Sequence, residues 1–280
     1  MNATKKNKIA TLYLEPQNGL CNRLRAIDST IALAHDHRAR IEVLWNMWDG
    51  MNCDLVELIC VPTSIENIWY WSSISRRKKL LKRVRELRIR AAGGQFFGDA
   101  DMLSARGFEA AGEALARGAP VYIKAYSRFY ERTKPYDWLK PRDTVRQGVT
   151  KIWASVSIGP VIGVHIRRET PKKAQQHSPL KLFLQKMETE LQRNPDVKFF
   201  LSTDSKMIET EVMTQFKNKV VVATKSAYTR VSKQDAIEAM IDLLCLAKTS
   251  KVIGSYWSSF SRTAAEIGGI ELELAHQGKA

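Results

Sequence analysis

The second half of the sequence repeats one pattern, in which a short apolar run is followed by a longer amphipathic segment. The apolar runs cover residues 161–166, 198–202, 220–222, 252–254 and 270–274, and the longer segments cover residues 179–192, 206–216, 233–248 and 259–267. Short apolar runs predict buried strands, and the segments between them have the periodicity of helices. Strands that alternate with helices form a parallel sheet with both faces covered. The sequence therefore predicts an α/β fold.

The beginning of the chain predicts a second unit of the same kind. A strand over residues 9–14 is followed by a turn-rich loop, a helix over residues 22–37 and a strand over residues 41–44. Gly19 precedes the helix, where a helix N-terminus can meet an anion. Because 280 residues are many for one compact domain, we expect two lobes, residues 1–150 and 151–280, that share one cleft. The pattern between residues 45 and 142 predicts no topology.

Polar clusters follow three of the predicted strands. Arg167-Arg168 comes after the first, residues 203–205 after the second and residues 255–259 after the fourth. In parallel sheets, ligands bind beyond the carboxyl ends of the strands. Paired arginines and the backbone N–H groups of a helix start both bind phosphate. Each cluster alone also fits a solvated ion pair, a turn or a helix cap. Their joint placement favours a di- or polyphosphate site.

The same segments resemble a known family. The sequences VIGVHIRR (residues 161–168), FLSTD (residues 200–204) and SYWSS (residues 255–259) resemble, in order and spacing, three motifs of the α1,2-, α1,6- and protein O-fucosyltransferase superfamily. The likeness is dense over residues 160–270 and thinner over residues 18–23, where the family has a glycine-containing loop under the donor.

This resemblance implies a GT-B-like fold of two Rossmann-type lobes, with the nucleotide-binding parallel sheet in the C-terminal lobe and the acceptor on the N-terminal side. It also implies inverting, metal-independent transfer of fucose from GDP-fucose to a hydroxyl of a glycan or glycoconjugate. Carried over by position, the implied donor-binding residues are Gly19, Asn22, Arg23, His165, Arg167, Arg168, Asp204, Asp242, Ser258 and Ser259.

Four of these positions carry specific roles in the resemblance, and one of them, Ser258, matches the serine that meets phosphate. Arg167 matches the arginine on the donor's β-phosphate, and His165 matches a residue near the guanine. Asp242 matches the aspartate that reads guanine, and a carboxylate can indeed accept hydrogen bonds from guanine N1–H and N2–H₂ together. The ordinary alternative for Asp242 is an exposed aspartate on a helix surface.

The catalytic base is the point where the sequence departs from the family. Relatives continue the two arginines with Thr-Asp, whereas this chain continues with Glu169-Thr170-Pro171. Inverting transfer needs the acceptor hydroxyl to lose its proton as it attacks C1, and a carboxylate within hydrogen-bond reach serves as the base. Glu169 is therefore the candidate base and Glu15 the reserve, while Arg167 is expected to stabilise the charge that develops on the leaving diphosphate.

A net charge of +15 predicts attraction to polyanions. The basic residues concentrate in the run RRKKLLKRVRELRIR over residues 76–90, where Leu80, Val84 and Leu87 recur at helical spacing. Two interpretations of this basic amphipathic helix remain open. Its apolar stripe either packs into the N-terminal lobe, or binds an anionic membrane where a lipid-linked glycan serves as acceptor.

The remaining expectations concern rival functions, location and metals. A different nucleotide-sugar donor and a nucleic-acid-binding protein are the alternatives, although the chain carries no legible RNA- or DNA-binding module, so we expect no specific nucleic acid partner. No apolar run of about 20 residues and no signal core are found, so we expect a cytoplasmic enzyme, peripheral at the inner membrane face. We expect no metal or cofactor, because the side chains of His35 and His37 do not face each other on a helix. The cysteines lack metal spacing and are expected to be reduced: Cys21, Cys53, Cys60 and Cys245.

Overall fold

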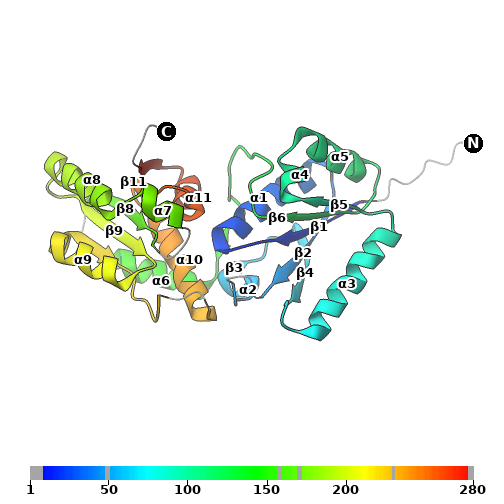
Figure 1. Ribbon diagram of the computed structural model, residues 1–280, viewed down its shortest axis with the longest axis horizontal. Coiled ribbons are helices and arrows are strands. Elements are labelled where there is room, and N and C mark those ends of the chain that lie inside the picture. Colours follow the sequence, from blue (N-terminus) through cyan, green and yellow to red (C-terminus); the bar gives the residue numbers. More distant parts are fainter. Residues whose placement is uncertain (1–8, 48–50, 157–158, 169–171, 229–230, 277–280) are drawn as a thin grey trace, which may run out of the picture. The chain divides into compact units, whose positions relative to one another are not determined.

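The computed structural model describes residues 9–47, 51–156, 159–168, 172–228 and 231–276. The chain divides into two compact units, Met1–Lys140 and Pro141–Ala280 (Figure 1). The division falls at Lys140 rather than at residue 150, because helix α6 (Asp143–Ala154) packs against α10 (Lys233–Ala247) of the second unit.

The first unit holds a five-stranded parallel sheet in the order β4-β2-β1-β6-β5. Its strands are β1 (Thr11–Pro16), β2 (Arg40–Asn46), β4 (Ile65–Trp71), β5 (Gln95–Gly98) and β6 (Val121–Ala125). Its helices are α1 (Leu20–Asp36), α2 (Leu55–Leu58), α3 (Arg76–Ala91), α4 (Asp99–Met102) and α5 (Ala105–Ala116). The short strands β3 (Ile59–Cys60) and β7 (Lys140–Pro141) form a separate pair.

The two faces of the first sheet differ in chemistry. Leu12 and Leu14 of β1 are fully buried, as the alternation of side chains along a strand requires for one face. On the other face, Tyr13 packs beside the buried cluster of Leu44, Ile89 and Tyr122. Glu15, which shares that second face, hydrogen bonds with Tyr122 and Lys82. Helix α3 therefore covers a sheet face that contains polar and charged groups.

The second unit holds another five-stranded parallel sheet, in the order β10-β9-β8-β11-β12. Its strands are β8 (Val161–Ile166), β9 (Lys198–Thr203), β10 (Val220–Val222), β11 (Lys251–Ser255) and β12 (Glu271–Ala275). Its remaining helices are α7 (Lys172–His177), α8 (Leu180–Arg193), α9 (Lys206–Phe216), a 3₁₀ turn (Lys217–Lys219) and α11 (Ser259–Gly268). The predicted α/β fold class and parallel sheet are confirmed.

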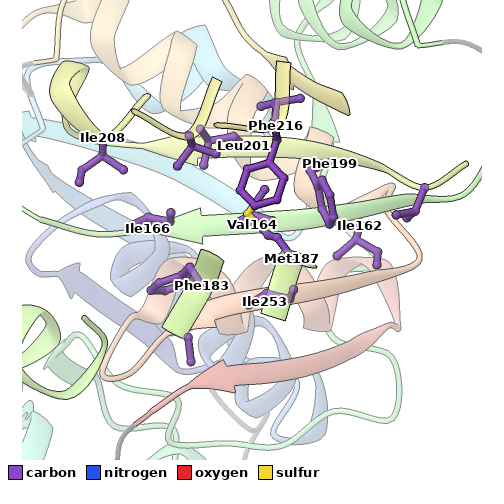
Figure 2. Packing of buried hydrophobic residues seen from close by; sticks show 14 residues of the cluster. Ile162, Val164, Ile166, Phe183, Met187, Phe199, Leu201, Ile208, Phe216 and Ile253 are labelled. Carbon is purple, nitrogen blue, oxygen red and sulfur yellow. The ribbon is translucent and has the colours of Figure 1, made fainter. Parts of the chain in front are cut away.

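The core of the second unit lies between this sheet and helices α8 and α9. Val164 of the central strand is fully buried beside Phe183 and Met187 of α8 and Phe216 of α9 (Figure 2). Alternate residues of β8 face the other way: an added Cβ at Gly163 would lie 2.8 Å from Thr249 and 2.9 Å from Leu246. Side chains from helices therefore pack against both faces of the sheet.

The described residues include free thiols, but no cluster placed to hold a metal ion and no helix able to cross a membrane. Cys21, Cys53 and Cys245 are buried and Cys60 is exposed, all as free thiols. Within the described ranges, no group of three or more His, Cys, Asp or Glu residues is placed to hold a metal ion. Over the same ranges, every helix is too short or too polar to cross a bilayer.

Candidate functional site

The three polar clusters predicted from the sequence meet at one edge of the second sheet. Strand β8 lies at the centre of the sheet, with β9 and β11 as its neighbours. Ile166 at the end of β8 is level with Thr203 of β9, and His165 is level with Gly254 of β11. Because the strands are parallel, the segments that follow them leave the sheet side by side. The predicted convergence of the clusters is confirmed.

Two side chains fix the backbone that carries the arginines. The Arg167 N–H donates to Ser255 Oγ at 3.0 Å, and Ser255 Oγ donates to the His165 carbonyl at 3.2 Å. The Arg168 N–H donates to Asp204 Oδ1 at 2.6 Å. Charge-assisted hydrogen bonds of this kind are about twice as strong as neutral ones. Asp204 and Ser255 therefore hold the end of β8 in place from the two neighbouring strands.

The Arg168 side chain is bound within the loop that follows β8. Arg168 Nη1 donates to the carbonyls of Arg167 at 3.0 Å and Ser178 at 3.1 Å, and the guanidinium carbon lies 5.9 Å from the Phe183 ring. Burial lowers the pKa of Arg168, although Asp204 and Glu211 oppose this effect. Its contacts therefore give Arg168 a role in shaping the loop. Arg167, directly after the strand, is half-buried as Arg168 is, and its contact with a phosphate stays a prediction.

His165 connects the central strand to the start of helix α11. Its ring is buried, with Nδ1 2.8 Å from Ser261 Oγ and 3.4 Å from Ser258 Oγ. Phe260 stacks on the ring with the centroids 4.8 Å apart. Ser258 caps the helix by accepting the Phe260 N–H at 3.3 Å. These contacts fix the N-terminus of α11, a helix end suited to an anion, beside the end of β8.

The turn between β11 and α11 has an unusual backbone. Trp257 has a φ of +59°, in the left-handed region that residues with side chains rarely adopt, and its indole is exposed. Outliers of this kind persist where the surrounding structure fixes them, and they gather at functional sites. Ser259, the first helical residue, is half-buried beside it. The turn places two hydroxyls and one indole at the same edge as Arg167.

Asp242 is buried, so the alternative of an exposed helix-surface aspartate is wrong. Its side chain lies in α10 with 3% of its surface exposed. Asp242 Oδ2 accepts Ser202 Oγ at 2.7 Å and Lys225 Nζ at 2.9 Å. Among the described residues, Oδ1 has no hydrogen-bond partner. Burial raises the pKa of Asp242, and Lys225 and Ser202 act in the opposite direction. One buried acceptor oxygen is thus left for a further donor.

Lys225 is a residue that the sequence analysis missed. It follows β10 in a loop without a motif, and its ammonium group also donates to the Thr203 carbonyl at 2.6 Å. It lies 5.5 Å from the ring of Tyr228, whose hydroxyl donates to the buried Glu209 at 2.5 Å. Burial and the bond to Glu209 raise the pKa of Tyr228 to about 12. No periodicity or motif signals these contacts, because they join loop residues to distant helices.

The predicted donor residues of the first unit are tied into its own structure. Gly19 is the N-cap of α1, and an added Cβ there would meet no atom within 4 Å. Asn22 Oδ1 accepts Arg25 Nη2 at 2.7 Å. Arg23 is fully buried and donates to the carbonyls of Asn18 at 2.6 Å and Asn46 at 2.7 Å. Arg23 therefore braces the loop before α1, and its contact with a donor stays a prediction.

Of the two candidate bases, Glu169 and Glu15, the structure describes only Glu15. Glu169 lies outside the described residues. Glu15 is buried at the end of β1, where it accepts Lys82 Nζ at 2.9 Å, Gln17 Nε2 at 3.2 Å and the hydroxyl of Tyr122. Burial and the nearby carboxylates raise the pKa of Tyr122, so this phenol stays protonated and donates. These partners give Glu15 a structural position in the first unit.

Comparison with solved structures finds the same fold in fucosyltransferases. The chain superposes on NodZ α-1,6-fucosyltransferase soaked with GDP-fucose with a TM-score of 0.62 and 16% identity, over 93% of each chain. A mutant of FUT1 from Arabidopsis thaliana in complex with GDP gives a TM-score of 0.64 and 12% identity, over 97% of this chain and 71% of the other. POFUT1 in complex with GDP gives 0.53 and 11%, over 95% and 98%.

Sequence comparison alone finds no relative. No protein-family model matches the sequence, and no curated protein matches it. At the identities given above, the structural likeness establishes the fold. The predicted GT-B-like fold is confirmed at that level, as a likeness to solved fucosyltransferase structures.

Proposed function

We propose that this chain is a glycosyltransferase that moves fucose from GDP-fucose to a hydroxyl of a glycan or glycoconjugate. One observation carries the proposal: Arg167 and the start of α11 meet at the carboxyl end of the central strand, in a fold shared with fucosyltransferases solved with GDP or GDP-fucose. That edge is where parallel α/β sheets bind nucleotides. An arginine and a helix N-terminus suit the diphosphate.

The proposed reaction is a single inverting displacement. The acceptor oxygen attacks C1 of the sugar while the bond from C1 to the β-phosphate oxygen breaks, and GDP leaves with that electron pair. Arg167 stabilises the negative charge that develops on the diphosphate. In the proposed mechanism this positioned cation takes the role that a metal ion would otherwise have. Glu169 takes the proton of the acceptor hydroxyl, and Glu15 is the reserve.

The base assignment is tested with matched amides. Glu169→Gln is expected to lower kcat by about 100-fold or more, because general-base catalysis contributes at least that much. Glu15→Gln is expected to lower the thermal midpoint instead, because it weakens the buried contacts with Lys82 and Tyr122. Steady-state kinetics and thermal melts of both variants separate the roles. Unchanged kcat in Glu169→Gln would remove this residue from the mechanism.

Calorimetric titration of the protein with GDP, UDP, GDP-fucose and GDP-mannose tests the proposed donor. We expect GDP and GDP-fucose to bind, UDP to bind weakly, and only GDP-fucose to be hydrolysed or transferred. Preference for another nucleotide sugar would keep the fold and replace the donor. The nucleic-acid alternative would be favoured if the protein bound random RNA but none of these nucleotides, with an RNA affinity that falls steeply at higher salt.

Asp242→Asn is expected to weaken GDP binding more than UDP binding. In the proposed complex, the carboxylate accepts guanine N–H donors, and the amide presents a donor group in place of one oxygen. The loss for GDP should be about tenfold, as for one hydrogen bond to a charged group. UDP binding to the same variant is the control, because any general damage to the site weakens both ligands. Equal GDP affinity in wild type and Asp242→Asn would show that Asp242 does not bind guanine.

A further inference from the structure

Helix α3 presents its apolar residues to solvent. The exposed fractions are 61% for Leu80, 60% for Leu81, 37% for Val84 and 64% for Leu87. Ile89 is the one buried residue of the helix. An amphipathic helix on a globular protein normally turns its apolar stripe toward the core. The interpretation in which Leu80, Val84 and Leu87 pack into the lobe is therefore wrong.

The inner face of α3 is charged because the sheet beneath it is acidic and aromatic. Lys82 Nζ lies 2.9 Å from Glu15 and 4.1 Å from the Trp71 ring centroid. Arg85 Nη1 lies 2.9 Å from Glu42, and its guanidinium carbon is 3.4 Å from the Trp69 ring centroid. Glu15 is buried and Glu42 is half-buried, and a carboxylate removed from water is stabilised by a paired cation, so Lys82 and Arg85 hold this side of α3 against the sheet. The orientation of α3 is thus fixed by contacts within the unit.

The outer face combines the apolar stripe with unopposed positive charge. At the helical repeat, Leu80, Val84 and Leu87 form one line. Arginines flank this line on both sides and are exposed: Arg76, Arg77, Arg83 and Arg88. The single acidic residue of the helix, Glu86, is half-buried and pairs with Lys82 at 3.3 Å. Within the described part of the chain, no ion pair is recorded for these four arginines.

We propose that the outer face of α3 binds the surface of a bilayer that contains anionic lipids. The leucines enter the boundary of the acyl chains, and the arginines lie against the lipid phosphates. A nucleic acid complements the charge of the arginines but does not bury the leucines in an apolar environment. A second copy of α3 complements the leucines but brings like charges together. An anionic bilayer satisfies both sets of residues, and the inference does not depend on the proposed activity.

Flotation of the full-length protein with vesicles tests this proposal. We expect binding to vesicles of phosphatidylcholine with phosphatidylglycerol, weaker binding at high salt, and none to phosphatidylcholine alone. Leu80→Ser with Leu87→Ser should weaken binding at least about tenfold, because each leucine loses burial in the membrane. Changing Arg76, Arg77, Arg83 and Arg88 to glutamine should weaken it about a hundredfold or more, at roughly fivefold per charge.

Matched variants control for general changes in hydrophobicity and charge. Leu103→Ser with Met207→Ser removes two exposed apolar residues elsewhere, with exposed fractions of 57% and 72%, and should bind as wild type does. The matched charge control changes Arg117, Arg146, Lys181 and Arg193 to glutamine and should retain most binding. Circular dichroism should show native helix content in all variants, since exposed substitutions cost little stability.

Three results would overturn the proposal. The first is absence of co-flotation at low salt. The second is binding that the leucine changes leave intact, since the protein would then act only as a polycation. The third is a dimer that light scattering detects in the absence of vesicles and that the two leucine substitutions dissociate. The apolar stripe would then be an interface between two copies of the chain.

Discussion

Arg167→Ala is expected to lower fucosyl transfer by about 100- to 1,000-fold while the fold stays intact. Removal of one positioned donor to developing negative charge costs about 3 to 4 kcal/mol of transition-state stabilisation. The Arg167 side chain is half-buried at a strand end, where substitutions rarely cost much stability. Single-turnover transfer from GDP-fucose, with circular dichroism on the same sample, measures both effects. Transfer within a few-fold of wild type would contradict the proposed site.

Two companion variants sharpen that experiment. Arg167→Lys should restore little activity, because lysine keeps the charge but lacks the planar guanidinium that binds two phosphate oxygens. Arg168→Ala should lower the thermal midpoint as well as transfer, because Arg168 donates to the carbonyls of Arg167 and Ser178. Arg193→Ala is the matched surface control, since the Arg193 side chain is exposed at the end of α8 and pairs with Glu190 at 2.9 Å. Equal thermal loss in Arg167→Ala and Arg168→Ala would indicate that both arginines are structural.

Lys225→Met is expected to lower the free energy of unfolding by about 3 to 5 kcal/mol at neutral pH. The variant leaves the carboxylate of Asp242 buried with only Ser202 as a donor, and breaking a buried pair from one side costs about that much. Urea unfolding measures the change. Lys181→Met, at an exposed position of α8, should stay within about 0.5 kcal/mol of wild type.

The deficit of Lys225→Met should shrink as the pH falls. Burial already raises the pKa of Asp242, and loss of Lys225 removes the opposing effect. A carboxyl whose pKa is higher in the folded than in the unfolded state binds its proton more tightly when folded, so acidification through the folded pKa stabilises the fold. The double variant Lys225→Met with Asp242→Asn should recover most of the loss, since no charge stays buried. A deficit that is constant with pH, or additive in the double variant, would contradict this coupling.

Local sequence pattern determined the elements of the second unit. The predicted bounds of β8, β10 and α9 are those of the structure, and the other predicted strands and helices of that unit differ by one residue at one or both ends; α6 and α7 were not predicted. Apolar alternation and helical spacing relate residues that are only a few positions apart, so a single sequence is enough to detect them. The same reasoning placed the polar clusters together, because parallel strands bring their carboxyl ends to one edge. In residues 45–142 several elements have four residues or fewer (α2, β3, β5, α4 and β7), too few to show a period, and outside the basic helix the pattern predicted no topology there.

Tertiary structure alone decided which charges pair and which faces are buried. The sequence places Lys225 and Asp242 17 positions apart without a shared motif, and only the packing of α10 on β9 brings them together. Helix α3 shows the same limit. Its periodicity correctly predicts a helix with an apolar stripe, yet Glu15 and Glu42 of distant strands pair with its cations and turn that stripe outward. Local periodicity fixes a helix and its two faces, but the energy of buried charges in the neighbouring sheet selects which face is covered.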